Sequence, residues 1–144
     1  MLNIVLVEPE IPSNTGNIAR TCGLRGSKLH LVKPLGFSVD DKHLKRAGLD
    51  YWHLLDITYY ENIEDFLANH SNDRLFLATT KAENLYSECT YQNGDYFLFG
   101  KETAGLPQWL REKYPDTCIT IPAAIIIYEA LRQLDFAGLK NFHH

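Results

Sequence analysis

The chain has 144 residues, 45% of them hydrophobic, which is enough for one domain with its own core and makes structural metals or disulfides unnecessary. The net charge of −4 argues against binding nucleic acid through overall positive charge, although a local basic cluster can still do so. No apolar run approaches the roughly 20 residues that cross a bilayer, and no secretory signal is recognisable, so we expect a cytoplasmic protein. Cys22, Cys89 and Cys118 are widely spaced and match no zinc pattern, so we expect reduced, buried thiols and no metal.

The first strand candidate, residues 3–7, runs into a polar loop and then a helix, a junction at which α/β proteins often build sites. Two prolines in the loop are expected to prevent a helix there. Asn14 and Asn17 can then cap a helix over 17–24 that carries Arg20 in its first turn. The pattern favours an exposed, positioned guanidinium, and a capped helix with a merely solvated arginine is the alternative.

Further strand and helix candidates alternate along the rest of the chain. The strands are expected at 28–32, 75–78, 96–99 and 118–121. The helices are expected at 41–47, with Asp40 or Asp41 as the N-cap, and at 63–69, 107–113 and 124–134. Such alternation predicts crossover connections on a mostly parallel sheet, which is an α/β fold in a single domain.

Charged and titratable side chains give weaker signals. Lys42, Lys45 and Arg46 form a basic cluster in the second candidate helix. The cluster is a candidate contact for nucleic acid, and an ordinary solvated helix face is the alternative. The histidines are scattered, and we expect His30 and His70 to be structural or exposed rather than catalytic.

Polar and glycine-containing loops follow several of the strands, where ligands of open α/β sheets bind. The loop at 100–107 contains Gly100, Glu102 and Gly105, so its backbone amides could approach a ligand while Glu102 orients a neighbouring donor. A tight turn before a helix at Pro107 is the alternative. Because the glycine-rich dinucleotide and nucleoside-triphosphate motifs are absent, a different nucleoside-type ligand is more plausible. Hydrolase and metalloprotease motifs are also absent.

Five segments carry a resemblance to a known family and occur in the family's order: 3–12, 14–20, 46–51, 100–107 and 128–134. With them the chain resembles the TrmL-type (YibK-like) group of the SPOUT RNA methyltransferases over nearly its whole length. The resemblance implies an α/β fold whose C-terminal part forms a deep trefoil knot, an exception to the rule against knotted chains. It also implies a homodimer that uses S-adenosylmethionine and no metal. The implied substrate is the anticodon stem-loop of leucine tRNAs, methylated on the ribose 2′-hydroxyl of the wobble cytidine or uridine derivative.

The resemblance also assigns roles to individual residues. Arg20 matches the arginine that the family places beside the methyl donor, and with Asn14 it is expected at the catalytic centre. Because a guanidinium is almost never deprotonated, we expect Arg20 to hold a phosphate and stabilise a developing alkoxide, with proton transfer as the second choice. The residues expected at the cofactor are Ala78, Thr79, Gly100, Glu102, Gly105, Leu106 and Ile121. The residues expected at the RNA are Arg20, Lys42, Lys45 and Arg46.

One segment departs from the family pattern. After Ile121-Pro122 the family carries a loop with Arg-Ser and Asn-Leu-Ser-Asn, whereas Ala123 follows Pro122 directly in this chain. A loop is therefore expected to be missing between Pro122 and Ala123, either because the chain as given omits it or because the protein has lost it. The competing functions are a SPOUT 2′-O-methyltransferase of another RNA and a non-catalytic RNA- or nucleoside-binding dimer.

Overall fold

The computed structural model describes residues 2–40, 42, 45, 52–79, 84–85, 89–101 and 104–120. Within them, seven strands form one sheet in the order β3-β2-β1-β6-β4-β7-β5, and neighbouring strands are parallel. The strands are β1 Asn3–Val7, β2 Lys28–Val32, β3 Ile57–Tyr60, β4 Leu75–Ala78, β5 Asn84–Leu85, β6 Tyr96–Phe99 and β7 Cys118–Thr120. The predicted α/β fold with a mostly parallel sheet is confirmed.

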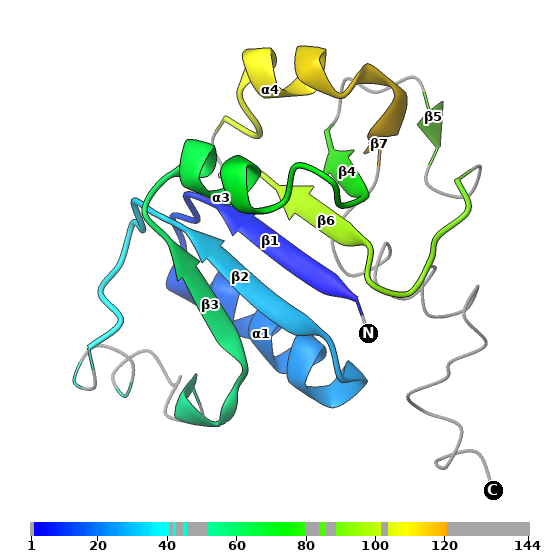
Figure 1. The fold of residues 1–144 in the computed structure, drawn as a ribbon. Helices are drawn as coiled ribbons and strands as arrows, with labels where there is room; N and C mark the ends of the chain where they lie inside the picture. Colours follow the sequence, from blue (N-terminus) through cyan, green and yellow to red (C-terminus); the bar gives the residue numbers. More distant parts are fainter. Residues whose placement is uncertain are drawn as a thin grey trace, which may run out of the picture.

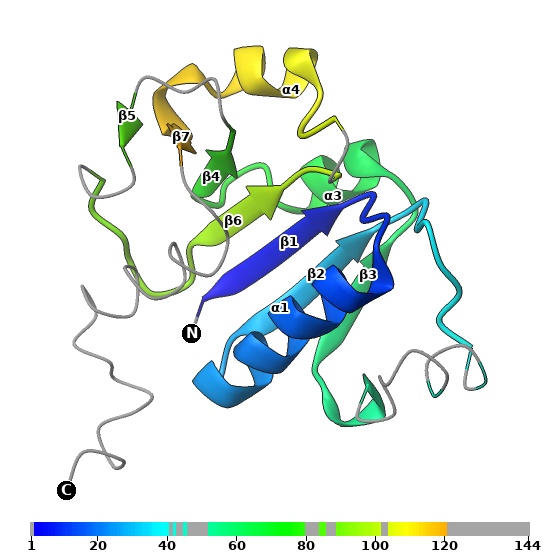
Figure 2. The same cartoon turned by 180° about the vertical axis from the view of Figure 1, so that it is seen from behind.

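Helices lie on both faces of the sheet (Figure 1). The α-helices are α1 Pro12–Arg25, α3 Ile63–Asn69 and α4 Gln108–Lys113, and the 3-10 helices are η1 Trp52–Leu54 and η3 Pro115–Thr117. Figure 2 shows α1 in front of β1, β2 and β3, with α3 behind the sheet. None of the helices in these ranges is long and apolar enough to cross a membrane.

The core has two parts because neighbouring side chains of a strand point to opposite faces of the sheet. In β1, Ile4 and Leu6 pack on the α1 side with Ala19, whereas Val5 and Val7 pack on the side of α3 and α4. Both faces of β1 are therefore buried, as expected for a central strand of a parallel sheet.

The start of α1 differs from the expectation. The helix begins at Pro12, five residues before the expected Asn17, and its N-cap is Ile11 without a side-chain hydrogen bond. Pro12 is compatible with this start because the first helical position needs no backbone N–H donor, and proline already has a helical φ. The expected caps Asn14 and Asn17 lie inside the helix, and both are exposed.

The other elements follow the expected ranges with small differences. The strands 3–7, 28–32, 75–78 and 96–99 and the helix 63–69 are confirmed at both ends, and α4 begins one residue after Pro107. Strands β3 and β5 were not expected. The knot and the helix at 124–134 lie outside the described residues, as do most of the helix at 41–47 and the last residue of the strand at 118–121.

Candidate active site

The carboxyl ends of four neighbouring strands meet at one edge of the sheet. Leu6 of β1 and Ala78 of β4 both pair with Phe99 of β6, and Ala78 also pairs with Ile119 of β7. The chain extends the sheet from β1 to β3 in one direction and then places β4 on the other side of β6. Open α/β sheets bind ligands outside the carboxyl ends of the strands at such a change of direction. We call this region the carboxyl edge.

The loop after β6 is folded tightly upon itself. The backbone amide of Gly105 donates to the carbonyl oxygen of Lys101 at 2.8 Å, and that of Ala104 donates to the same oxygen at 3.3 Å. Gly105 has a φ of 69°, in the left-handed region that favours glycine. A Cβ atom on Gly100 would lie only 2.0 Å from the carbonyl carbon of Gly105. The tight turn, which was the alternative to a ligand-binding loop, is therefore present, and the Gly105 amide donates its hydrogen bond inside it.

The loop after β1 contains a backbone conformation that is rare for its residue type. Glu8, directly after β1, has a φ of 54°, although it is not a glycine. Its amide donates to the carbonyl oxygen of Val32 at 2.9 Å. Its carboxylate Oε1 lies 3.6 Å from the Nζ atom of Lys101, and both side chains are about one-third exposed. The loops after β1 and β6 are thus joined by an ion pair at the carboxyl edge.

The structure brings several of the expected cofactor residues to this edge. Ala78 ends β4, Gly100 directly follows β6, and both are partly exposed. Thr79 donates its amide to the Ile119 carbonyl at 2.9 Å. The side chain of Leu106 is 3% exposed and packs in the core, so only its backbone could face a ligand. Glu102 and Ile121 lie outside the described residues.

The expected catalytic arginine lies away from this edge. Arg20 is exposed and lies in the third turn of α1, not in the first turn as expected. Eight residues separate it from Pro12, and at a rise of about 1.5 Å per residue this places it about 12 Å along the helix from its start. Asn14, in the first turn, is also exposed. The backbone of Arg20 therefore lies about two turns behind the start of the helix.

The expected RNA contacts are only partly described. Lys42 and Lys45 are exposed, and Arg46 lies outside the described residues. Both lysines follow the loop after β2, and this loop contacts the loop after β1 through a hydrogen bond from the Gly36 amide to the Pro9 carbonyl at 2.9 Å. Because the side chains of both described lysines are exposed, they can contact a large ligand.

A buried polar network lies on the α3 side of the sheet. His30 is 4% exposed, and its Nε2 and Nδ1 atoms lie 2.9 Å from Asn3 Oδ1 and 3.0 Å from Tyr60 Oη. Tyr60 Oη also lies 2.8 Å from Nε2 of His70, and His70 Nδ1 lies 2.8 Å from Asp73 Oδ2. Burial, with the nearby His70, lowers the pKa of His30 to about 4, and burial raises the pKa of Tyr60 to about 12. The expected structural role of these histidines is consistent with this network.

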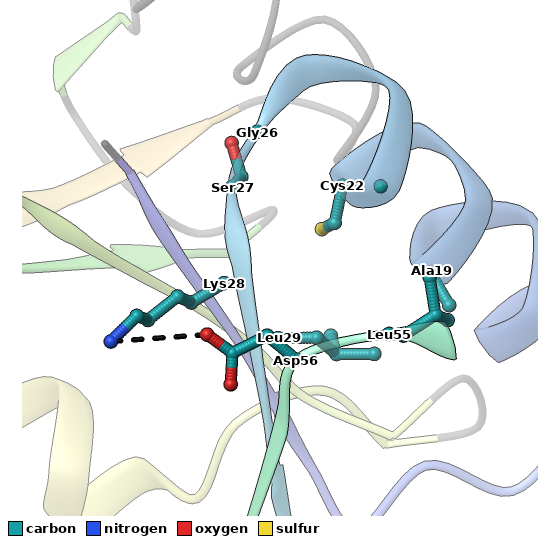
Figure 3. A pocket seen from close by; sticks show the side chains of 9 residues that line it. Ala19, Cys22, Gly26, Ser27, Lys28, Leu29, Leu55 and Asp56 are labelled. Carbon is teal, nitrogen blue, oxygen red and sulfur yellow. Dashed lines mark ion pairs between the residues drawn. The ribbon is translucent and has the colours of Figure 1, made fainter. Parts of the chain in front are cut away.

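A pocket of about 230 Å³ lies at the opposite edge of the sheet, where α1 ends and β2 begins (Figure 3). Its lining residues are Ala19, Cys22, Gly23, Gly26, Ser27, Lys28, Leu29, Leu55 and Asp56. The ammonium of Lys28 lies 3.9 Å from the carboxylate of Asp56 at its rim. Burial raises the pKa of the Cys22 thiol to about 12, so this thiol is not a nucleophile at neutral pH.

No disulfide joins the three cysteines, all of which lie in described ranges. Cys22 and Cys118 are buried as expected, whereas Cys89 is only half-buried. Among the described residues, no three side chains of His, Cys, Asp or Glu come together as metal ligands would.

The fold and the site define an α/β protein with candidate ligand loops at the carboxyl edge of a parallel sheet. The model of the SpoU rRNA Methylase family matches residues 1–127, and the chain belongs to this family. It is 47% identical over 152 residues to the tRNA (cytidine(34)-2′-O)-methyltransferase of Methylovorus glucosotrophus, an alignment that covers 96% of this chain and 99% of the relative.

Two solved structures share the fold over almost the whole chain. A Bacillus anthracis protein has a TM-score of 0.90 and 46% identity, covering 97% of this chain and 98% of its own. A second structure has a TM-score of 0.85 and 38% identity, covering 94% of this chain and 97% of its own, and is described as giving insight into the 2′-OH methylation of C/U34 on tRNA.

Proposed function

We propose that this protein is an S-adenosylmethionine-dependent tRNA 2′-O-methyltransferase that acts on the wobble cytidine, or a uridine derivative, of leucine tRNAs. The observation that carries the proposal is the full-length identity of 47% with a tRNA (cytidine(34)-2′-O)-methyltransferase. The family's arginine and glycine-rich loop are both present, at Arg20 and at 100–107.

The described residues fit an adenosine-containing cofactor at the carboxyl edge. Ala78 ends β4, and Gly100 directly follows the adjacent strand β6. Both are small and partly exposed, so a ligand can approach the backbone there. Thr79, Gly105 and the Leu106 backbone complete the described part of the site, and Glu102 and Ile121 are proposed to join it. When bound, S-adenosylmethionine supplies the methyl group, and the chain's own task is to hold it and to exclude water.

Arg20 is proposed to act on the RNA side of the reaction. Its exposed guanidinium can hold a phosphate of the tRNA and stabilise the negative charge that develops on the ribose oxygen. Its place in the third turn of α1 supports a homodimer in which Arg20 of one subunit serves the cofactor loop of the other. Lys42, Lys45 and Arg46 are proposed to contact phosphates of the anticodon stem-loop. Asn14 is proposed to shape the same catalytic centre.

A second function, a non-catalytic RNA- or nucleoside-binding dimer, is favoured by the departure after Pro122. The alignment with the Methylovorus protein extends over 152 residues, whereas this chain has 144, so the relative contains residues without a counterpart here. This difference is what a chain that lacks a loop between Pro122 and Ala123 would give. We propose that such a chain still forms a single domain. If the loop holds groups needed for methyl transfer, its absence leaves binding without catalysis.

Transfer of labelled methyl from S-adenosylmethionine to total tRNA, followed by nucleoside mapping, tests the proposal. We expect label in a 2′-O-methylated wobble nucleotide. Label in another nucleotide or only in ribosomal RNA would assign a different substrate. Calorimetric binding of S-adenosylmethionine and tRNA without any transfer would favour the non-catalytic dimer.

A further inference from the structure

The ion pair between Glu8 and Lys101 lies where the two proposed functional loops meet. The backbone of Glu8 is in the left-handed region, with a φ of 54°. This conformation is unfavourable for a residue with a Cβ atom, and such strain persists where the surrounding structure holds it, often at functional sites. A glycine would adopt it without strain, yet the chain has a glutamate whose carboxylate lies 3.6 Å from Lys101 Nζ.

Lys101 connects this carboxylate to the fold of the loop after β6. Its carbonyl oxygen accepts hydrogen bonds from the amides of Ala104 and Gly105, so the residue closes the turn. Its side chain extends to Glu8 in the loop after β1. Because the backbone of Gly100 is packed closely against Gly105, we expect a shift of Lys101 to displace the turn with it.

We propose that Glu8 is a positioning residue for methyl transfer, which holds Lys101 and so sets the loop 100–106 against the segment that leads into α1. This inference rests on the proposed function, since that loop is proposed to hold the cofactor. The pair is partly exposed, so its attraction adds little to global stability. Its effect is on the placement of the loop, and displacements of about 1 Å at a reacting centre can lower rates by about 100-fold.

Substitution of Glu8 by glutamine tests the role of the charge with little change in shape. We expect Glu8→Gln to lower kcat/KM for S-adenosylmethionine by about tenfold, within the range for misplaced reacting groups, and to leave KM for tRNA unchanged. Lys101→Glu should have the same effect. The double variant Glu8→Lys with Lys101→Glu restores the ion pair with the positions of the two charges exchanged. It should recover a large part of the lost kcat/KM.

Glu8→Gly separates the positioning role from a merely structural one. Because glycine relieves the unfavourable φ, we expect this variant to unfold at a temperature equal to or higher than that of the wild type. We expect it nevertheless to lose kcat/KM as Glu8→Gln does. Asp56→Asn is the matched control, because it removes a similar ion pair with Lys28 at the opposite edge of the sheet. It should leave the kinetics unchanged.

Three results would each overturn the inference. Glu8→Gln could have the kcat and KM of the wild type, or Glu8→Gln and Asp56→Asn could lose the same amount of kcat/KM. The third result is a charge-reversed double variant that recovers no kcat/KM. In those cases a wild-type protein that methylates tRNA still supports the proposed function. If the wild-type protein binds S-adenosylmethionine but methylates no RNA, calorimetric dissociation constants for the same variants replace the kinetic ones. If it does not bind S-adenosylmethionine, the proposed function fails and this inference fails with it.

Discussion

At the residue scale, His30 shows how a buried side chain can be held in one protonation state. The side-chain oxygen Oδ1 of Asn3 can only accept a hydrogen bond, so Nε2 of His30 donates to it. The Asn3 amide group itself donates to the Gly94 carbonyl oxygen at 3.2 Å, which fixes its orientation. Nδ1 of neutral His30 then accepts from the hydroxyl of Tyr60. Burial rather than the hydrogen bonds keeps His30 neutral, because it lowers the pKa of this side chain to about 4.

This state makes stability depend on pH. The pKa of His30 is about 4 in the folded protein, whereas an unperturbed histidine has a pKa of about 6.5. Between these values the unfolded chain binds the additional proton, so the free energy of unfolding falls as the pH falls, by up to about 3 kcal/mol. His30→Gln should remove this contribution. Urea unfolding of both proteins at about pH 7 and pH 4 measures it, and an equal pH dependence of the two would contradict the assignment.

Arg20 gives the second prediction at this scale. Arg20→Ala should lower methyl transfer to tRNA by about 100-fold or more, because it removes a group proposed to stabilise developing charge. The dissociation constant for S-adenosylmethionine should stay nearly unchanged, since the residue is proposed to serve the ribose side. Arg20→Lys, which keeps the charge but loses the planar fork, should retain part of the activity. A weakened affinity for S-adenosylmethionine in Arg20→Ala would refute this role.

At the scale of elements, the sequence predicts the buried strands well and the edge strands poorly. Strands such as Asn3–Val7 and Tyr96–Phe99 are rich in apolar side chains because both of their faces are covered. Strand β3 has two exposed residues, Thr58 and Tyr59, and no continuous apolar run. Strand β5 has two residues and exists through its pairing with β7, which no local pattern reveals.

Helix α1 shows a different limit of the sequence signal. Proline was expected to exclude a helix, but its effect depends on position, and at Pro12 it starts one. This shift moves Arg20 from the expected first turn to the third. The motif thus predicts which residues are candidates. Their distance from the carboxyl edge follows only when the residue at which the helix begins is known from the structure.

The prediction at the scale of elements concerns the affinity of the loop after β6 for the cofactor. Gly100→Ala should raise the dissociation constant for S-adenosylmethionine at least about tenfold and cost roughly 1–3 kcal/mol of stability, because its Cβ would overlap the backbone of Gly105 and Leu106. Gly94→Ala is the control. It has a φ of 92° and no atom within 4 Å of the added Cβ, so it should cost about 1 kcal/mol without a change in affinity. Similar affinities in both variants would show that the loop does not hold the cofactor.

At the scale of the whole molecule, the order of the strands decides which loops can share a site. The sequence predicts alternating strands and helices, but not that β6 lies between β1 and β4. That arrangement brings Glu8 and Lys101 together although they are far apart in sequence. It also leaves Arg20 on a helix that runs away from the same edge. For this arrangement we propose that a second subunit completes the site.

Subunit mixing tests this composite site. Arg20→Ala and Gly100→Ala subunits are co-expressed with different affinity tags, and the heterodimer is purified through both tags. Its rate is measured at a concentration of S-adenosylmethionine at which each variant alone has little activity. If Arg20 of one subunit serves the loop of the other, one of the two sites contains both native residues, and the heterodimer should have about half of the wild-type rate. If each site used the arginine and the loop of the same subunit, both sites would be defective. The heterodimer would then be as inactive as its parents, and the catalytic pair would have to lie within one chain.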